Sequence, residues 1–320
     1  SIADIYTIDN FKTIDCGNLY AFILERTKHL VKETSFIGMI VPLSGHSTER
    51  MTSLVTHFYN AFSLRYLCNL SADAHPSILF EGVKFRLSIF IVNNTYSGYF
   101  TSKYTKWYAD EREYLFTNIV KYNQQQGYKY KNVIGKVSGH LYISAIQKVL
   151  KDTSFFFCHN GVFVCLYHNA PVHWIRSHSF KPYFHSERDG EGLSTQLKPI
   201  KFDSNEKVKI ASCVLNSNLF FTWWICNSDC YHLNKAEIAN FPITFNTELK
   251  LELVKLSDLL AEDMLKNSVR RIYNYKTSGR VEYDEFYMKL SKPIIDEIDK
   301  VLAKHYGFYY QLRYQVPYGQ

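Results

Sequence analysis

The segment from Gly17 to Pro42, GNLYAFILERTKHLVKETSFIGMIVP, is the most informative part of the sequence about the fold. Four of its apolar residues recur at helical spacing and share one face: Leu19, Phe22, Ile23 and Leu30. They predict an amphipathic helix that lies on a sheet. The run from Phe36 to Val41 is continuously apolar and is closed by proline, which is typical of a strand covered on both faces. A helix followed at once by a buried strand is the repeating unit of an α/β sheet.

More elements of this kind follow, up to about residue 95. A second set of apolar residues at helical spacing predicts another helix: Met51, Leu54, Val55, Phe58 and Phe62. Strands are predicted from Leu64 to Leu70 and from Lys84 to Val92. The link between them has about a dozen residues without helical period, so these strands should pair antiparallel as a hairpin. The predicted fold class is therefore α/β, as the second half of an open sheet with one reversed strand.

Composition narrows the class of protein. The 320 residues are 46% hydrophobic, and no apolar run approaches the roughly 20 residues of a membrane span, so we expect a soluble protein without a membrane partner. From the start, Ser-Ile-Ala-Asp, we expect no secretory signal. The seven cysteines are scattered and form no CxxC motif, which favours a reducing cytoplasm and no metal site. A net charge of +7 and 16% aromatic residues are compatible with a nucleic-acid partner without establishing one.

The pattern of predicted secondary structure changes near residue 97. Between 97 and 245, short predicted strands alternate with polar loops: Phe155 to Phe157, Val162 to Tyr167 and Val208 to Val214. Helices are predicted from Tyr108 to Val120 and from Ser217 to Cys226. After Pro242 comes a leucine-spaced helix, and a final helix is capped by Ser291 and stops at Gly307. We expect three regions, 1–96, 97–245 and 246–320, the last of them helical.

Three segments resemble adenine-specific DNA methyltransferases of restriction–modification systems, especially the type II enzymes in which nuclease, methylase and DNA reader share one polypeptide. The first is GNLYAFILERTKHLV with the strand FIGMIVP. The second is ILFEGVKFRLSIFIVNN, from Ile78 to Asn94. The third is LNSNLFFTWWICNSDCYHLNKAEIANFPI, from Leu215 to Ile243. The tail SKPIIDEIDKVLAKHYGF is also similar to the end of these enzymes. The resemblance implies the C-terminal portion of a Rossmann-like catalytic domain, a target-recognition domain and a helical tail.

The resemblance also implies a base pocket. Residues at the helix start would line the junction of the S-adenosylmethionine and target-base pockets: Asn18, Leu19, Tyr20 and Phe22. Phe80 would pack against the adenine after the base is flipped out of the duplex, because its amino group is inaccessible inside the stack. Lys84 and Arg86 would contact phosphate. The alternatives are a plain amphipathic helix and a Phe80 that belongs to the core.

The third segment is expected to act mainly as scaffolding. The resemblance implies a turn formed by Ser228, Asp229, His232 and Leu233, and then an exit formed by Phe241 and Pro242. We favour a structural role for Trp223 and Trp224, while His232 and Lys235 are candidates for DNA contacts. In the tail, Asp296, Glu297 and Asp299 lie in the first helical turns, where carboxylates complement the N-terminus of their helix.

Base reading is expected in the middle region. Its basic candidates are Lys136, His140, Arg176, His178, Lys181, Arg188, Lys198 and Lys201. Arginine and lysine pair with guanine edges, although most such charges contact phosphate or solvent.

Two motifs of the family are absent from the chain: the glycine-rich loop for S-adenosylmethionine and the (Asn/Asp)-Pro-Pro-(Tyr/Phe) motif that accepts hydrogen bonds from the target amino group. We therefore expect no catalytic residue in this chain and no methylation by it alone. It would begin within a catalytic domain whose N-terminal half supplies the chemistry, with duplex DNA as substrate. The alternatives are a stand-alone DNA-binding specificity module that partners a separate catalytic subunit, and a structural remnant.

Overall fold

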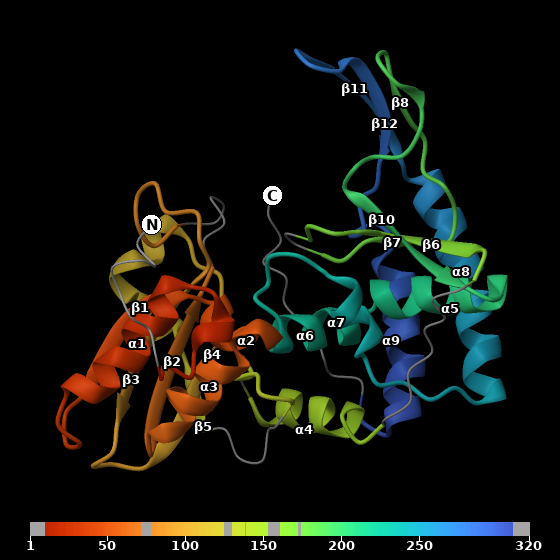
Figure 1. Cartoon of the computed structure of the whole chain (residues 1–320). Coiled ribbons are helices and arrows are strands. Elements are labelled where there is room, and N and C mark those ends of the chain that lie inside the picture. The colour runs from red at the N-terminus through yellow and green to blue at the C-terminus, as the bar shows by residue number, and fades with distance from the viewer. Residues whose placement is uncertain are drawn as a thin grey trace. The chain divides into compact units, whose positions relative to one another are not determined.

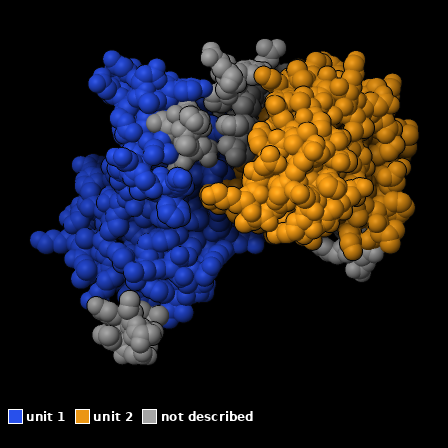
Figure 2. All heavy atoms as spheres, turned by 90° about the horizontal axis from the view of Figure 1, so that it is seen from above, with its two compact units in different colours: residues 1–144, 225–230, 317–320 blue, residues 145–224, 231–316 orange. Residues whose placement is uncertain are grey.

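The computed structural model describes residues 10–71, 78–124, 130–137, 139–152, 161–171 and 174–309. The chain divides into two compact units, which Figure 2 shows in different colours. Unit 1 holds residues 1–144, 225–230 and 317–320, and unit 2 holds 145–224 and 231–316. The strand predicted from Phe155 to Phe157 lies outside the described residues. In the described part of the chain, no helix is both long and apolar enough to span a membrane.

Unit 1 is built around a five-stranded sheet with the order β1-β3-β2-β4-β5 (Figure 1). Its strands are β1 (Ile37–Pro42), β2 (Leu64–Leu70), β3 (Leu87–Asn93), β4 (Gly98–Thr105) and β5 (Tyr122–Gln124). β3 lies between β1 and β2 and is antiparallel to both, whereas β4 is parallel to β2. The antiparallel pairing predicted for residues 64–70 and 84–92 is confirmed.

The sheet continues past the boundary predicted between residues 96 and 97. β4 starts at Gly98, and its aromatic and hydroxylated residues suit a strand. Asn69 of β2 stabilises the pairing of β2 with β4, because its side-chain amide donates to Thr101 Oγ1 and to the Ser102 carbonyl, both at 2.9 Å. The predicted boundary therefore does not fall at an edge of this sheet.

One face of the sheet is covered by short helical segments. They are η2 (Ile14–Cys16), α1 (Leu19–Leu30), α2 (Ser44–Ser47), η3 (Glu49–Met51), α3 (Thr52–His57) and η4 (Tyr59–Ala61). Leu24, Leu54 and Phe58 pack there against the inward residues of β1 and β3, Ile37 and Phe90. Gly17 allows the turn between η2 and α1, since its φ of 59° lies in the left-handed region.

α1 buries a different face from the one predicted. Its buried residues are Ala21, Leu24 and Glu25, whereas Leu19 and Leu30 are 68% and 69% exposed. Glu25 is held inside because its carboxylate accepts hydrogen bonds from the Lys12 and Thr13 amides, at 2.8 and 2.9 Å, and from the Thr13 hydroxyl. The helix prediction is confirmed, but the apolar stripe is not its core face.

The opposite face of the sheet is covered only in part. η5 (Ala109–Tyr114) and the π-helix η6 (Leu115–Ile119) occupy the region predicted as one helix. Leu115 and Trp107 pack there with Cys68, Leu70 and Leu87.

Unit 2 contains a helical layer and two small sheets. Its helices are α5 (Asn205–Asn216), α7 (Lys235–Ala239), α8 (Thr247–Lys266) and α9 (Lys292–Tyr306), while α4 (His140–Val149) and α6 (Asn218–Asn227) run across the division into units. The strand predicted from Val208 to Val214 is wrong, because these residues belong to α5. Most of α5 is buried, and a continuous apolar run does not distinguish a buried helix from a strand. α8 and α9 lie where the sequence predicts them, and α9 ends at Gly307 with a φ of 67°.

The two sheets of unit 2 lie beside its helices (Figure 1). One has the order β10-β6-β7, formed by β6 (Phe163–His168), β7 (Ser177–His178) and β10 (Leu197–Phe202). The other has the order β11-β12-β8-β9, formed by β8 (Phe184–Ser186), β9 (Gly190–Glu191), β11 (Val269–Tyr275) and β12 (Gly279–Glu285). The region 246–320, expected to be helical, therefore contains a hairpin, which pairs with β8 from the middle of the chain.

Asp299 stabilises a different helix from its own. It is buried, and its carboxylate accepts hydrogen bonds from the Leu219 amide at 3.2 Å and from the Asn218 side chain, at the start of α6. The expectation that it complements the N-terminus of its own helix is wrong. Trp223 and Trp224 of the same helix α6 are buried, as their structural interpretation requires.

Burial raises the pKa of Asp299 to about 7, against roughly 3.9 in an unfolded chain. Between these values the folded chain binds a proton that the unfolded chain lacks, so this group lowers stability as the pH rises. Asp299→Asn cannot titrate, and its stability relative to wild type should increase from about pH 4 to 7, by up to about 1.4 kcal/mol per pH unit. Urea denaturation at several pH values measures this difference. Glu297→Gln, at an exposed position of α9, is the control, and parallel profiles for wild type and Asp299→Asn would contradict the assignment.

Candidate functional site

Three residues at the start of α1 were predicted to line a base pocket, but their side chains point in different directions. The Tyr20 hydroxyl lies 3.6 Å from Met51 Sδ, and its ring packs beside Gly45. Phe22, two positions further along α1, makes an edge contact with Phe11, at 6.2 Å between ring centroids. Asn18 precedes α1 and donates to the Cys16 carbonyl at 3.1 Å. Of the three, Tyr20 is the residue that faces the loop following β1.

Phe80 lies in the link between β2 and β3 and is 44% exposed. The alternative of a core Phe80 therefore does not hold. Arg112 holds this link, because its guanidinium donates to the Ile78 and Leu79 carbonyls at 3.0 and 3.1 Å and lies over the Trp107 ring. An exposed aromatic on an anchored loop is able to stack on a base, which keeps the predicted role of Phe80 open to test.

The two basic residues next to Phe80 differ. Lys84 is exposed, and no ion pair to it is found in the described part of the chain. Arg86 is buried, with its Nε donating to the Tyr104 hydroxyl at 2.9 Å. The phosphate contact predicted for Arg86 does not fit this placement, and Lys84 alone remains accessible for one.

Lys136 is fully buried rather than available for base reading. Its ammonium donates to Ser47 Oγ at 3.2 Å and to the carbonyls of Cys226 and Ser228, all within unit 1. Burial, with the charge of Lys136, lowers the pKa of the adjacent His46 to about 3, so that imidazole is neutral. The DNA contact predicted for Lys136 is therefore wrong. The lysine cross-links the α2 turn to the end of α6.

The other predicted DNA contacts are scattered, and all of them except His140 belong to unit 2. Lys198, Lys201 and Lys235 are exposed and make no ion pair with any described residue. Lys198 and Lys201 stand three positions apart on β10, so their side chains point to opposite faces. Lys181 pairs with Glu191 at 3.1 Å, and the exposed His232 ring lies 3.3 Å from the Asn169 carbonyl. His140 starts α4, and its side chain lies outside the described ones.

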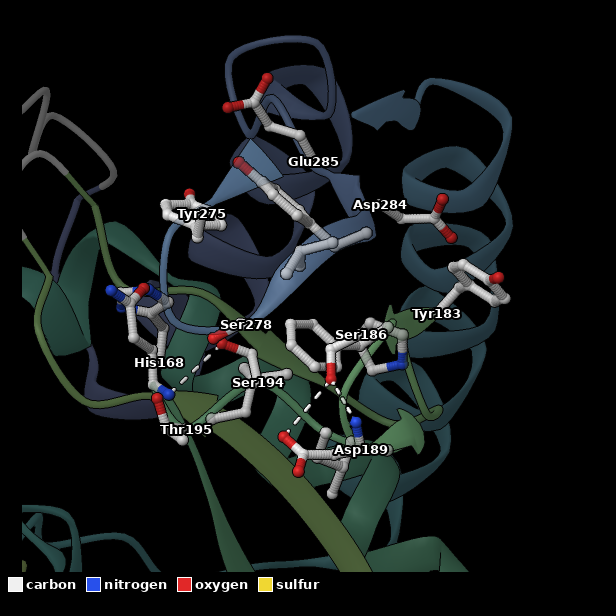
Figure 3. Close-up of a pocket in the computed structure, with 18 of the residues that line it drawn as sticks. His168, Tyr183, Ser186, Asp189, Ser194, Thr195, Tyr275, Ser278, Asp284 and Glu285 are labelled. Atoms are coloured by element: carbon white, nitrogen blue, oxygen red, sulfur yellow. Dashed lines mark hydrogen bonds between the residues drawn. The ribbon is translucent and has the colours of Figure 1, made fainter. Parts of the chain in front are cut away.

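Arg176 and His178, by contrast, meet at a cavity of about 520 Å³ in unit 2. The cavity lies among β6, β7, the β8–β9 hairpin, the following loop and the β11–β12 hairpin. Figure 3 shows Tyr275 and Glu285 on one side and Ser194, Thr195 and Asp189 on the other. The structure thus brings residues about 100 positions apart in the sequence to one site.

The acids around this cavity are already partnered. Asp189 pairs with Arg188 at 2.8 Å and Asp284 with Arg270 at 2.7 Å. Glu285 Oε2 accepts from Arg271 Nε at 2.8 Å and from the Tyr287 hydroxyl, which lowers the pKa of Glu285.

His178 is buried at the cavity, and Arg176 is partly buried there. Burial lowers the pKa of Arg176, and it lowers that of His178 to about 3, with the charge of Arg176 as the next cause. His178 is therefore neutral. Its ring lies against Phe286 at 4.8 Å between centroids, and its Nδ1 has no hydrogen-bond partner among the described residues.

Several cavity residues were not candidates from the sequence: His168, Gln196, Tyr275 and Tyr283. For Tyr275 and Tyr283 the signal was an aromatic segment from Val269 to Tyr275 followed, across a Thr-Ser-Gly turn, by a second one, which predicts a hairpin. No sequence signal identified His168 or Gln196. Among the described residues, no cluster of three or more His, Cys, Asp or Glu side chains could hold a metal ion.

Comparisons with known proteins add little. No protein-family model matches the chain, and no curated protein sequence matches it. A solved structure entitled "cryoEM structure DrdV-DNA complex" is weakly similar, with a TM-score of 0.38 and 7% sequence identity. The similarity covers 89% of this chain and 51% of that one, so this chain spans about half the length of its counterpart. A likeness at this level decides neither fold nor function.

The buried position of Lys136 predicts a structural effect of its removal. Lys136→Ala should lower the free energy of unfolding by about 2–4 kcal/mol, because it leaves buried carbonyls without a donor. Lys84→Ala, at an exposed lysine, should change it by less than about 0.5 kcal/mol. Urea denaturation measures both variants. A Lys136→Ala protein of wild-type stability that no longer bound DNA would restore the DNA-contact interpretation.

Proposed function

We propose that the chain is a portion of a site-specific, adenine-specific DNA methyltransferase. Unit 1 would be the second half of the Rossmann-like catalytic domain, and unit 2 would bind and read the duplex. The observation that carries the proposal is the open edge of the unit 1 sheet, taken together with the sequence segments that resemble this family.

The order β1-β3-β2 supports this proposal. β1 and β2 run parallel to one another, because each is antiparallel to β3. The sequence predicts one reversed strand, paired with the strand from Leu64 to Leu70, for the closing half of the sheet; the position of β3 between two parallel strands is an observation of the structure. On its other side, β1 pairs with no strand in the described part of the chain, so its backbone groups face outward there.

The surface beside this edge is apolar. In β1, Ile37 and Val41 point into the core, so Ile40 lies on the opposite face and is 47% exposed. Ile91 of β3, which lies opposite Gly38, shares that face and is likewise exposed. Further large apolar side chains are exposed on the neighbouring elements: Leu19, Ile23 and Leu30 of α1, and Phe36 just before β1. Exposed apolar groups on both sides of a free strand edge favour a missing α/β layer.

That layer would supply the chemistry. In the proposed enzyme it carries the glycine-rich loop for S-adenosylmethionine and the Pro-Pro motif for the target amino group, so direct methyl transfer needs both halves. Phe80 would hold the flipped adenine, since its ring is exposed on an anchored loop. Tyr20, whose hydroxyl lies near Met51, would face the same pocket. Phe22 would not, because its ring packs against Phe11.

The open edge is also compatible with a DNA-binding specificity module that docks on a separate catalytic subunit. The two readings differ in whether the catalytic half is encoded in the same polypeptide. The reading frame upstream of this chain distinguishes them, because a fused enzyme has the glycine-rich loop and the Pro-Pro motif there.

Mixing the two halves tests the enzyme. The chain and a separately produced segment with both motifs should each be inactive alone and should together transfer labelled methyl groups from S-adenosylmethionine to the adenines of duplex DNA. Ile40→Asp should reduce this transfer at least about tenfold, because a carboxylate would be buried at the joint. Leu251→Asp, at an exposed leucine of α8, should leave it unchanged. Mixtures that methylate no DNA under any condition would refute the proposal.

Salt dependence tests the DNA contacts. The logarithm of the duplex affinity should fall linearly with the logarithm of salt concentration. Lys198→Gln with Lys201→Gln should make the slope shallower by about 1–2, at roughly 0.9 per lost phosphate contact. Lys300→Gln, whose side chain pairs with Glu297 on α9, serves as the control and should leave the slope as it is. An affinity that does not change with salt concentration would count against DNA as the partner.

A further inference from the structure

We propose that the cavity of unit 2 binds a single guanine base that is not stacked in a duplex, with Arg176 as its specificity-determining residue. This goes beyond the proposed methyltransferase function, whose adenine pocket lies in unit 1, and it rests on the proposed binding of DNA. It assigns a second base site to a different part of the chain.

The shape and walls of the cavity suit a flat aromatic ring. Its volume of about 520 Å³ greatly exceeds that of an inorganic anion. Tyr275, Val281 and Tyr283 line it and lie on the same face of the β11–β12 hairpin, because Tyr273 is opposite Val281 and strand residues alternate. Bases stack on tyrosine rings regardless of sequence, so this wall provides affinity for a base in general.

The charges at the cavity call for a ligand with hydrogen-bond acceptors. The lining acids Asp189, Asp284 and Glu285 are bonded to other arginines. Arg176, by contrast, donates no side-chain hydrogen bond to any described residue, although its guanidinium is close enough to Glu285 to interact with its charge. A partly buried guanidinium on a cavity wall that donates to no described side chain is a donor pair without an acceptor there.

Gln196 adds a second donor. His168 accepts from the Ala170 amide through Nδ1, which makes its Nε2 the donor to Gln196 Oε1 at 2.6 Å. The carboxamide oxygen is thereby occupied, and its NH₂ group is left to donate. His178, with its unpartnered Nδ1, closes the same wall.

This set of donors selects among the bases. Guanine presents two adjacent acceptors, O6 and N7, which an arginine contacts with both arms. Adenine presents an amino donor beside N7, and that group would oppose the guanidinium. A phosphate would also satisfy Arg176 but would leave the tyrosine wall and most of the volume unused. The geometry therefore favours guanine over adenine and over a backbone contact.

The test uses single-stranded oligothymidylates that carry one central dG, one 7-deaza-dG or no purine, with affinity to the full chain measured by fluorescence anisotropy. The dG oligonucleotide should bind at least about tenfold more tightly than the thymidine-only one, and removal of N7 should abolish most of that preference. In Arg176→Gln the preference should disappear, while binding of the thymidine-only oligonucleotide should remain. Arg176→Lys should restore it only in part, because lysine lacks the bidentate fork.

Controls separate specificity from folding and from charge. Arg26→Gln, at an exposed arginine of α1, removes the same charge outside the cavity and should keep the preference for dG. Thermal melting checks that Arg176→Gln is folded. Should that variant unfold, the 7-deaza-dG oligonucleotide on wild-type protein still tests the site. The inference is overturned by a wild-type chain without preference for dG, or by a folded Arg176→Gln that keeps it. Equal loss of affinity for both oligonucleotides would show a phosphate contact and overturn it as well.

Different binding results would refute the guanine site and the proposed function. A chain that binds duplex DNA with the expected salt dependence but shows no preference for dG would refute the guanine site alone. A chain that binds no nucleic acid at all would refute both.

Discussion

The antiparallel strand β3, placed between β1 and β2, is the constraint on which the first half of the structure depends. It pairs with both neighbours along its whole length, so it sets the register of the sheet and points Ile37, Phe90 and Leu67 toward one helical layer. Because β3 occupies one side of β1, the other side of β1 is left as an edge. The exposed Ile40 and Ile91 follow from the same register, since strand residues alternate between faces.

Buried charge explains why the chain's most polar residues are not all functional. Lys136, Glu25 and Asp299 are each enclosed, and each is bonded to backbone groups from a distant segment. A buried charge is tolerated only with such partners, so these residues join segments rather than meet a ligand. Arg176 is the contrast, because its guanidinium is only partly buried, lies on a cavity wall and donates to no described side chain. Burial and hydrogen bonding together, rather than charge alone, distinguish the charged residues that stabilise the fold from those of the candidate site.

Base reading in the proposed enzyme would depend on a surface built from distant parts of the chain. The β11–β12 hairpin supplies tyrosines, the segment before β7 supplies Arg176, and the loop before β10 supplies Gln196. The pairing of β12 with β8 holds these pieces together. Each segment alone looks like an ordinary exposed strand or loop. Their chemistry becomes specific only where the donors converge.

The local elements are predictable from the amino-acid sequence alone: the helix after Asn18, the strands of the hairpin, the leucine-spaced α8 and the end of α9 at Gly307. These follow from periodicity and capping, which act over a few residues. Long-range packing, by contrast, determines which face of α1 is buried, that Lys136 and Arg86 are enclosed, that residues 205–216 form a helix, and that the β11–β12 hairpin pairs with β8. Those outcomes depend on contacts between residues far apart in the chain. A local sequence pattern does not show which distant residue forms the hydrogen bonds that a buried polar group needs.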